Sequence, residues 1–282
     1  MLELDEVDLA YEVHGVVPSS DGRPPLLIIG QPMDASGFRP LVARLPERTV
    51  VTYDPRGLGR SVRHDGYVEH VPDVQARDVH TLIRALGGGP VDMFASSGGA
   101  VTALALVAAH PEDVGTLVAH EPPLIGVLPD AAAARRAWDD VRETYEKHGG
   151  GAGMAAFIAW TSWRGEFTDA YFSGPAPDPA AFGLPSADDG RRDDELLARS
   201  DAVCTYAIDA RALLDAPTRI VLAAGEESAD QFAGRGADGV ARLLGHDLTL
   251  FPSHHAGFSD GSAGPPGEPD AFAERLRAIL DA

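Results

Sequence analysis

Residues 91–99 constrain the fold of this chain more than any other stretch. An apolar run from Val91 to Phe94 ends in the small residues 95–99 (Ala-Ser-Ser-Gly-Gly), and an Ala/Leu/Val-rich helical pattern follows at once. This order predicts a strand, a tight turn and a buried helix. Small neighbours allow Ser97 to adopt a strained turn conformation, and the free N–H groups of the following helix favour an anion beside it. The small residues therefore have two explanations. They allow the strand to pack closely on the helix, or they form a catalytic turn with Ser97 as the nucleophile.

Strand and helix signals alternate on both sides of this turn. Apolar or alternating runs typical of strands occupy 7–13, 26–29, 49–53, 115–119, 219–224 and 248–251. Helical patterns occupy 38–45, 72–86, 98–109, 229–244 and 270–281. Because such alternation builds parallel strands joined by crossover helices, the sequence predicts an α/β fold with a mostly parallel sheet flanked by helices.

The strand signal stops in one long segment. Helical patterns at 130–148, 152–163 and 191–214 surround a Pro/Gly-rich connector at 173–190. We expect an α/β core formed by 1–124 and 217–282, with 125–216 inserted as a helical cap. Large aromatic side chains that face the sheet from such a cap would form an apolar substrate pocket. Phe157, Trp160 and Trp163 are the candidates, against the alternative that they only form the core of the cap.

Charge and cysteine content exclude several classes of protein. The formal net charge is −20 and Lys147 is the only lysine, so no basic cluster exists to bind nucleic acid or an anionic membrane. The single cysteine, Cys204, excludes an internal disulfide and a thiolate metal cluster. The acidic first residues differ from a signal peptide, and no apolar run reaches the roughly 20 residues that span a bilayer. We expect a cytoplasmic protein that acts on a small molecule; the pattern does not indicate an oligomeric state.

Four motifs, in this order, resemble those of the α/β-hydrolase superfamily. Residues 29–32 (Ile-Gly-Gln-Pro) are similar to its oxyanion loop, and 54–61 (Asp-Pro-Arg-Gly-Leu-Gly-Arg-Ser) to its D-x-R-G-x-G-x-S stretch. Residues 95–99 resemble the nucleophile elbow G-x-S-x-G, with Ala95 in place of the first glycine. Residues 252–258 (Pro-Ser-His-His-Ala-Gly-Phe) resemble the loop that carries the catalytic histidine. The resemblance runs from end to end of the chain and implies a serine hydrolase.

The resemblance implies roles for individual residues. Ser97 would be the nucleophile, and His255 the base that takes its proton, with His254 as the alternative base. The backbone N–H groups of Gln31 and Gly98 would form the oxyanion hole.

The acid of the triad is not where the resemblance places it. It usually lies three residues after the glycine that closes the penultimate strand, and counting from Gly225 this position holds Ser228. A serine cannot carry the charge that stabilises an imidazolium. Glu121, at the end of a buried strand, is the preferred candidate, because a charge in such a position needs a partner. The alternatives are a Ser–His dyad without an acid, or a carboxylate of the loop after Gly225 (Glu226, Glu227 or Asp230).

These residues predict a serine hydrolase that cleaves an ester, thioester or lactone of a small to medium apolar compound through an acyl-enzyme. A serine nucleophile argues against the dehalogenases and epoxide hydrolases of this fold, which attack with a carboxylate. No metal or nucleotide motif is present, so we expect no cofactor and no metal. C–C bond hydrolysis, perhydrolysis, acyl transfer and a non-catalytic ligand-binding scaffold are the alternatives. Asp54 and Arg56 are expected to hold their loop by a local ion pair.

Overall fold

The large sheet has the parallel architecture that the alternating pattern predicts. The computed structural model describes residues 1–282 apart from 20–21, 67–68 and 263–264. The strands are ordered β10-β9-β8-β7-β4-β5-β3, and each neighbouring pair is parallel except β5 with β3. In chain order they are β3 (Tyr11–His14), β4 (Leu26–Gln31), β5 (Val50–Tyr53), β7 (Val91–Ser97), β8 (Val114–His120), β9 (Arg219–Gly225) and β10 (Thr249–Phe251). A small antiparallel sheet contains β1 (Leu2–Glu3), β2 (Val7–Leu9) and β6 (Val62–Arg63).

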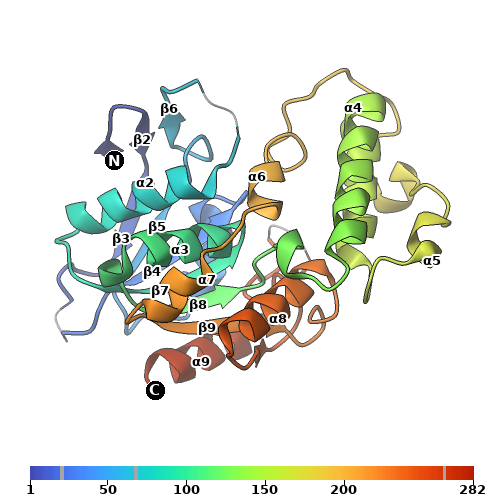
Figure 1. The fold of residues 1–282 in the computed structure, drawn as a ribbon. Helices are drawn as coiled ribbons and strands as arrows, with labels where there is room; N and C mark the ends of the chain where they lie inside the picture. Colours follow the sequence, from blue (N-terminus) through green and yellow to red (C-terminus); the bar gives the residue numbers. More distant parts are fainter. Residues whose placement is uncertain (20–21, 67–68, 263–264) are drawn as a thin grey trace.

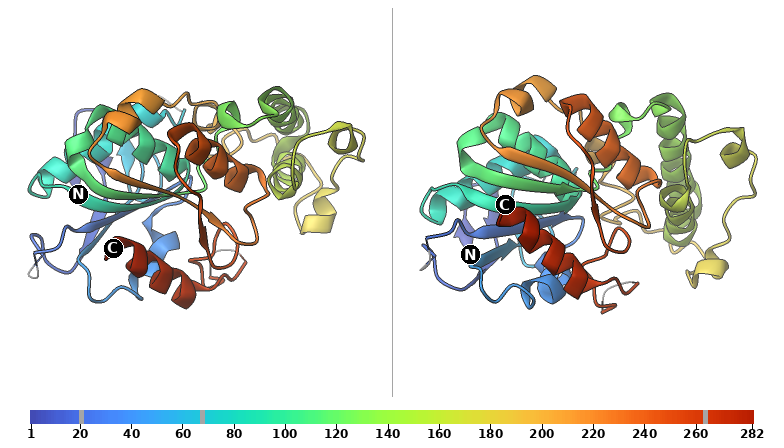
Figure 2. Two further views of the ribbon diagram at one scale, coloured as in Figure 1. Left: turned by 60° about the horizontal axis from the view of Figure 1, so that its bottom comes forward. Right: turned by 90° about the horizontal axis from the view of Figure 1, so that it is seen from below.

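Helices cover both faces of the large sheet (Figures 1 and 2). On one face lie α2 (Pro72–Ala85), α3 (Gly98–Ala109) and α8 (Phe232–Leu244), and on the other lie α1 (Arg39–Val42) and α9 (Pro269–Leu280). Each face has its own apolar core. Short 3₁₀ turns occur at Ala35–Phe38, Pro111–Asp113, Ile125–Val127 and Pro179–Phe182. The predicted fold class is confirmed. No described helix is long and apolar enough to cross a membrane.

Much of the chain between β8 and β9, including α4 (Ala131–Ser162) and α5 (Asp169–Phe172), lies beside the sheet as a separate group of helices (Figure 1). This segment also contains α6 (Asp201–Cys204) and α7 (Ala210–Asp215). Its own apolar core lies along α4, where the rings of Trp138 and Trp160 have centroids 4.9 Å apart. The last helix, α7, packs on α3 of the main layer. The division into a core and a cap at 125–216 stays our proposal.

Helical periodicity in the inserted segment predicts its structure only in part. The patterns at 130–148 and 152–163 correspond to the two helical stretches of α4, which meet at a kink at Gly149, whose backbone is not helical (φ 84°, ψ −176°). The expected helix over 191–214 is wrong, because only α6 and α7 are helical there. The carboxylate of Asp194 accepts hydrogen bonds from the N–H groups of Leu196 (3.0 Å) and Leu197 (2.8 Å). Such local side-chain bonds compete with helical ones.

The expected single strand at 7–13 is also interrupted. It is divided between β2 of the small sheet and β3 of the large sheet, on either side of Ala10. The Ala10 N–H donates to the hydroxyl of Ser61 at 2.9 Å, and its carbonyl accepts from the N–H of Asp54. Ala10 is therefore bonded to the loop after β5 instead of to a continuous strand ladder.

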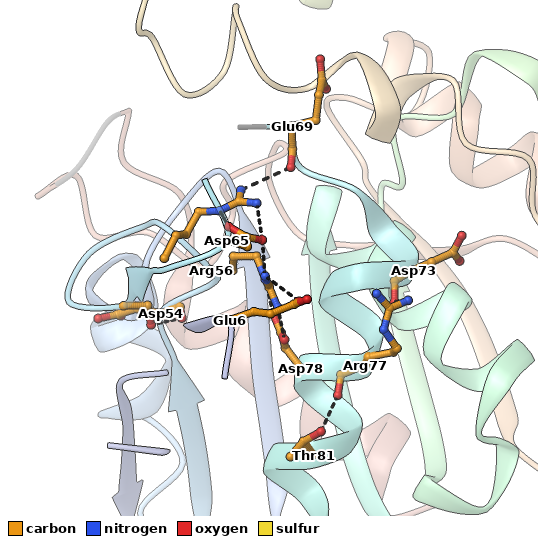
Figure 3. Close-up of polar contacts among 11 residues, drawn as sticks. Glu6, Asp54, Arg56, Asp65, Glu69, Asp73, Arg77, Asp78 and Thr81 are labelled. Atoms are coloured by element: carbon orange, nitrogen blue, oxygen red, sulfur yellow. Dashed lines mark hydrogen bonds and ion pairs between the residues drawn. The ribbon is translucent and has the colours of Figure 1, made fainter. Parts of the chain in front are cut away.

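Arg56 holds its loop through partners that the sequence did not indicate (Figure 3). Asp54 pairs with Arg60 at 2.9 Å. The Arg56 guanidinium makes a bidentate contact with Asp78 of α2, with Nε–Oδ2 at 2.8 Å and Nη2–Oδ1 at 2.7 Å. A further bond joins it to Asp65 at 2.5 Å. The expected Asp54–Arg56 pair is wrong, and Arg56 instead ties the loop after β5 to α2.

Replacing Arg56 by methionine is expected to lower the free energy of unfolding by ~3–5 kcal/mol, because the Asp78 carboxylate is left buried without its charge partner. Arg56 and Asp78 are both almost fully buried. Urea unfolding measures the loss. The matched control is Arg77→Met, since Arg77 is exposed on α2, the helix that carries Asp78. This substitution should change the free energy of unfolding by no more than ~0.5 kcal/mol. Equal stability of the two variants would contradict this account of the ion pair.

Candidate active site

Ser97 lies at a sharp turn between β7 and α3. Its backbone φ of 56° and ψ of −129° belong to a region that non-glycine residues rarely adopt. The turn brings α3 so close to β4 that a Cβ atom on Gly99 would lie 2.7 Å from the Cα of Gly30. Glycine is required at this close approach, which explains why small residues mark the turn in the sequence.

The carboxylate of Glu121 contacts His255 directly. Glu121 follows β8, is 1% exposed and has a positive φ of 51°. Its Oε2 accepts a hydrogen bond from Nδ1 of His255, which lies in the loop after β10. Its Oε1 accepts two more, from the N–H of Gly225 at 2.8 Å and from the hydroxyl of Ser228 at 2.5 Å. Both oxygens of Glu121 therefore have partners, and in the described part of the chain Nε2 of His255 has no hydrogen-bond partner.

The other candidates for base and acid have different partners. His254 directs Nε2 to the carbonyl of Pro266 at 3.1 Å, and Asp230 pairs with Arg164 at 2.5 Å. Among the described residues, Glu121 is the carboxylate that reaches His255.

Burial and charge act against each other at this pair. Burial would raise the pKa of Glu121, but the charge of His255 and hydrogen bonds from His255 and Ser228 lower it to about 2. For His255, burial would lower the pKa, whereas the charge and hydrogen bond of Glu121 raise it above the ordinary value. The neighbouring His120 is enclosed by aromatic rings, and burial lowers its pKa to about 4. At neutral pH, Glu121 is therefore ionised and His120 is neutral.

The N–H groups expected to stabilise an oxyanion belong to residues beside Ser97. Gln31 ends β4 and pairs in register with Ser97. Gly98 begins α3, so its N–H has no acceptor within the helix. Both residues line the same cavity as Ser97.

That cavity has a volume of about 290 Å³ and also reaches Glu121 and His255. Most of its remaining wall is apolar and comes from the loops after β4 and β8, from α4, from residues 196–204 and from the start of α8. These apolar residues are Pro32, Pro123, Phe157, Trp160, Leu196, Val203, Cys204, Phe232 and Ala233. A smaller cavity of about 160 Å³ shares Ser97 and His255 with it and is lined further by Met33, Gly37 and Phe258.

The aromatic candidates for a substrate pocket separate into two groups. Phe157 and Trp160 line the larger cavity, and Trp160 also belongs to the apolar core along α4. Trp163 lines neither of the two cavities at Ser97. The helix ends before Trp163, whose Nε1 donates to the carbonyl of Glu166 at 2.9 Å.

Phe232 and Val203 line the cavity but were not candidates. Phe232 begins α8 and Val203 lies in α6, and only the folding of the chain places these helices near Ser97. Apolar side chains of this kind resemble ordinary core residues, so no local pattern distinguishes them as pocket residues.

A group of residues with metal-ligand atoms lies at the amino end of β8, away from the carboxyl end where Glu121 follows. The ligand atoms of His80, His110 and Asp113 are within 4.8 Å of one another. The two imidazoles are stacked, with centroids 3.8 Å and planes 15° apart. Stacked rings direct their in-plane lone pairs side by side instead of toward one point, so we assign no metal to this group. The expected absence of a metal stays a prediction.

Comparisons with known proteins identify the fold. A model described as alpha/beta hydrolase fold matches residues 24–152. The chain is 25% identical to the uncharacterized hydrolase YraK of Bacillus subtilis, over 99% of this chain and 95% of that protein. It is 37% identical to the putative carbamate hydrolase RutD of Caulobacter segnis, over 39% of this chain and 41% of that protein. The solved enol-lactonase from Burkholderia xenovorans has a TM-score of 0.63 and 17% identity, covering 98% of this chain and 97% of that one.

The chain therefore has the α/β-hydrolase fold.

Proposed function

We propose that this protein is a serine hydrolase that cleaves an ester, thioester or lactone of a small to medium apolar compound through an acyl-enzyme. The observation that carries the proposal is the hydrogen-bonded pair of Glu121 and His255, which lines one cavity together with Ser97. In this proposal Ser97 is the nucleophile, His255 the base, and Glu121 the acid that orients the base.

Each residue has one task in the reaction. Nε2 of His255 accepts the proton of Ser97 while the serine oxygen attacks the acyl carbon, and ionised Glu121 stabilises the imidazolium that forms. The N–H groups of Gln31 and Gly98 stabilise the oxyanion of the tetrahedral intermediate. The imidazolium gives its proton to the leaving oxygen or sulfur as the bond to the acyl carbon breaks. Water, deprotonated by His255, then attacks the acyl-enzyme, and the imidazolium returns this proton to the oxygen of Ser97 as the carboxylic acid leaves.

The larger cavity favours a neutral, apolar substrate. Its wall is mainly apolar, and it is lined by no lysine or arginine among the described residues. A carboxylate on the substrate would lose its hydration there without gaining a cation, and it would meet the negative charge of Glu121. The names of two relatives, a putative carbamate hydrolase and an enol-lactonase, also denote substrates with a carbonyl carbon bound to a heteroatom.

Two p-nitrophenyl esters with acyl chains of equal length test this substrate class. We expect the butyrate to be hydrolysed with a much larger kcat/KM than the hemisuccinate, which differs by its terminal carboxylate. Release of p-nitrophenol measures both. Equal rates for the two esters would contradict the proposed preference, and no turnover of esters, thioesters or lactones would contradict the proposed reaction.

Phe157→Ala is expected to shift the preferred acyl chain toward longer esters, because it enlarges the cavity beside Ser97. Each methylene that gains or loses a contact changes kcat/KM by about 1–3 kcal/mol in activation free energy. Trp163→Ala, outside the cavity, is the matched control and should leave the order of chain lengths unchanged. The measurement is kcat/KM over a series of p-nitrophenyl esters. The same order of chain lengths in Phe157→Ala and the wild type would show that Phe157 does not contact the acyl group.

A further inference from the structure

The hydroxyl of Ser228 has no task in the reaction described above, although it lies at the site. Ser228 is 1% exposed, and its Oγ lies 2.5 Å from Oε1 of Glu121. The N–H of Gly225 donates to the same oxygen at 2.8 Å. We propose that Ser228 is a positioning residue that, with the Gly225 N–H, holds one oxygen of Glu121 so that the other stays on His255. The inference rests on the proposed function, because it takes Glu121 as the acid.

The position of Glu121 makes such an anchor necessary. The residue follows β8 in a positive-φ conformation, and its side chain reaches across to the loop after β9. Its backbone N–H donates to the carbonyl of Ala223 in β9 at 2.9 Å. A glutamate side chain has several free torsions, and ordering them costs conformational entropy. Two donors on Oε1 fix the last of these torsions and thereby the direction of Oε2.

The donor is itself held by the turn that contains it. The Ser228 N–H donates to the carbonyl of Gly225 at 3.1 Å, and the Ser228 carbonyl accepts from the N–H of Gln231 at 2.9 Å. The hydroxyl therefore comes from a turn that begins at the end of β9. Its effect on Glu121 is one of geometry as well as of charge.

A hydroxyl suits this position better than a carboxylate when Glu121 is present. A carboxylate at residue 228 would place a second negative charge against a buried one, and one of the two would have to take up a proton. The serine hydroxyl instead donates to the anion and stabilises it. The serine at 228 and the glutamate at 121 are thus complementary.

The titration of His255 reports on this anchor. The groups that face its imidazole are the Glu121 carboxylate and, at a centroid distance of 6.1 Å, the ring of His120. Since buried His120 is neutral at neutral pH, the contact with Glu121 sets how readily His255 holds a proton. If the contact loosens, the pKa of His255 falls toward its ordinary value.

Ser228→Ala tests the proposal against Ser61→Ala. Ser61 is also buried, and its hydroxyl donates to the carbonyl of Asp54 and accepts from the N–H of Ala10. We expect Ser228→Ala to lower kcat/KM about 10–100-fold, an effect of the size seen when an orienting outer partner is lost. The acid limb of the pH–rate profile of Ser228→Ala should move to lower pH. Ser61→Ala should lower stability and leave that profile in place.

Two further measurements keep the test decisive. Ser228→Cys nearly keeps the side-chain volume and weakens the hydrogen-bond donor. Its kcat/KM should therefore lie between those of the wild type and Ser228→Ala. It replaces the alanine variant if that variant fails to fold. NMR titration of the His255 imidazole follows the same pKa without turnover, so an inactive wild-type enzyme refutes the proposed function alone. A His255 pKa and a pH profile that do not change in folded Ser228 variants would overturn the proposal.

Discussion

Ester turnover is expected to fall on the order of 10⁶-fold when Ser97 is replaced by alanine, because the nucleophile is removed from a unit whose members act together. The fold should be retained, since the Ser97 side chain makes no capping hydrogen bond to α3. Hydrolysis of p-nitrophenyl butyrate and the Tm of the variant measure the two effects. A rate equal to that of the wild type would remove Ser97 from the mechanism.

The two adjacent histidines provide the matched comparison. His255→Ala should lose nearly as much activity as Ser97→Ala, because a serine without its base is a poor nucleophile. His254→Ala should keep most of the wild-type rate, because this imidazole contacts the Pro266 carbonyl and the N–H of Ala256 instead of Glu121. The reverse order would assign the base to His254.

Glu121→Gln is expected to lower kcat by up to about 10⁴-fold. The amide carries no charge to stabilise the imidazolium, and it allows the wrong tautomer of His255. The matched control is Glu227→Gln, because the Glu227 side chain is exposed. Asp230, in the same loop, is paired with Arg164 and is therefore a less suitable control. Near-wild-type kcat in Glu121→Gln, or a large loss in Glu227→Gln, would place the acid in the loop after Gly225.

The pH–rate profile also tests whether Glu121 is the acid, because the replacement of Glu121 should shift the profile in a known direction. His255 acts as a base only when it is neutral, so kcat/KM falls as the pH drops through its pKa. Glu121 raises that pKa above the ordinary value, so the acid limb of the wild type lies above about pH 6.5. In Glu121→Gln the residual activity should show this limb at lower pH, because the charge that favours the imidazolium is gone.

Features set by neighbouring residues could be predicted from the sequence. The small residues around Ser97 are dictated by the close approach of α3 to β4, and they mark the turn without any knowledge of distant contacts. The continuous apolar runs of the buried strands likewise follow from burial on both faces. The fold class was therefore accessible from local patterns.

Features set by distant residues could be predicted only as alternatives. Glu121 and His255 are 134 residues apart in the chain, and only the order of strands in the sheet brings them together. The role of Ser228 as a donor was hidden for the same reason, since the sequence shows only that a carboxylate is missing there. The sequence near Arg56 contains several acidic residues that could pair with it. The packing of α2 against the loop after β5 places Asp78 in contact with Arg56.

The central claim, an activated Ser97, is tested most directly by labelling with a fluorophosphonate probe, followed by peptide mass mapping. The account predicts a single covalent adduct per chain on Ser97 in the wild type. It predicts much slower labelling in Glu121→Gln and none in Ser97→Ala. A folded wild-type protein that stays unlabelled, or that is labelled at another serine, would contradict it.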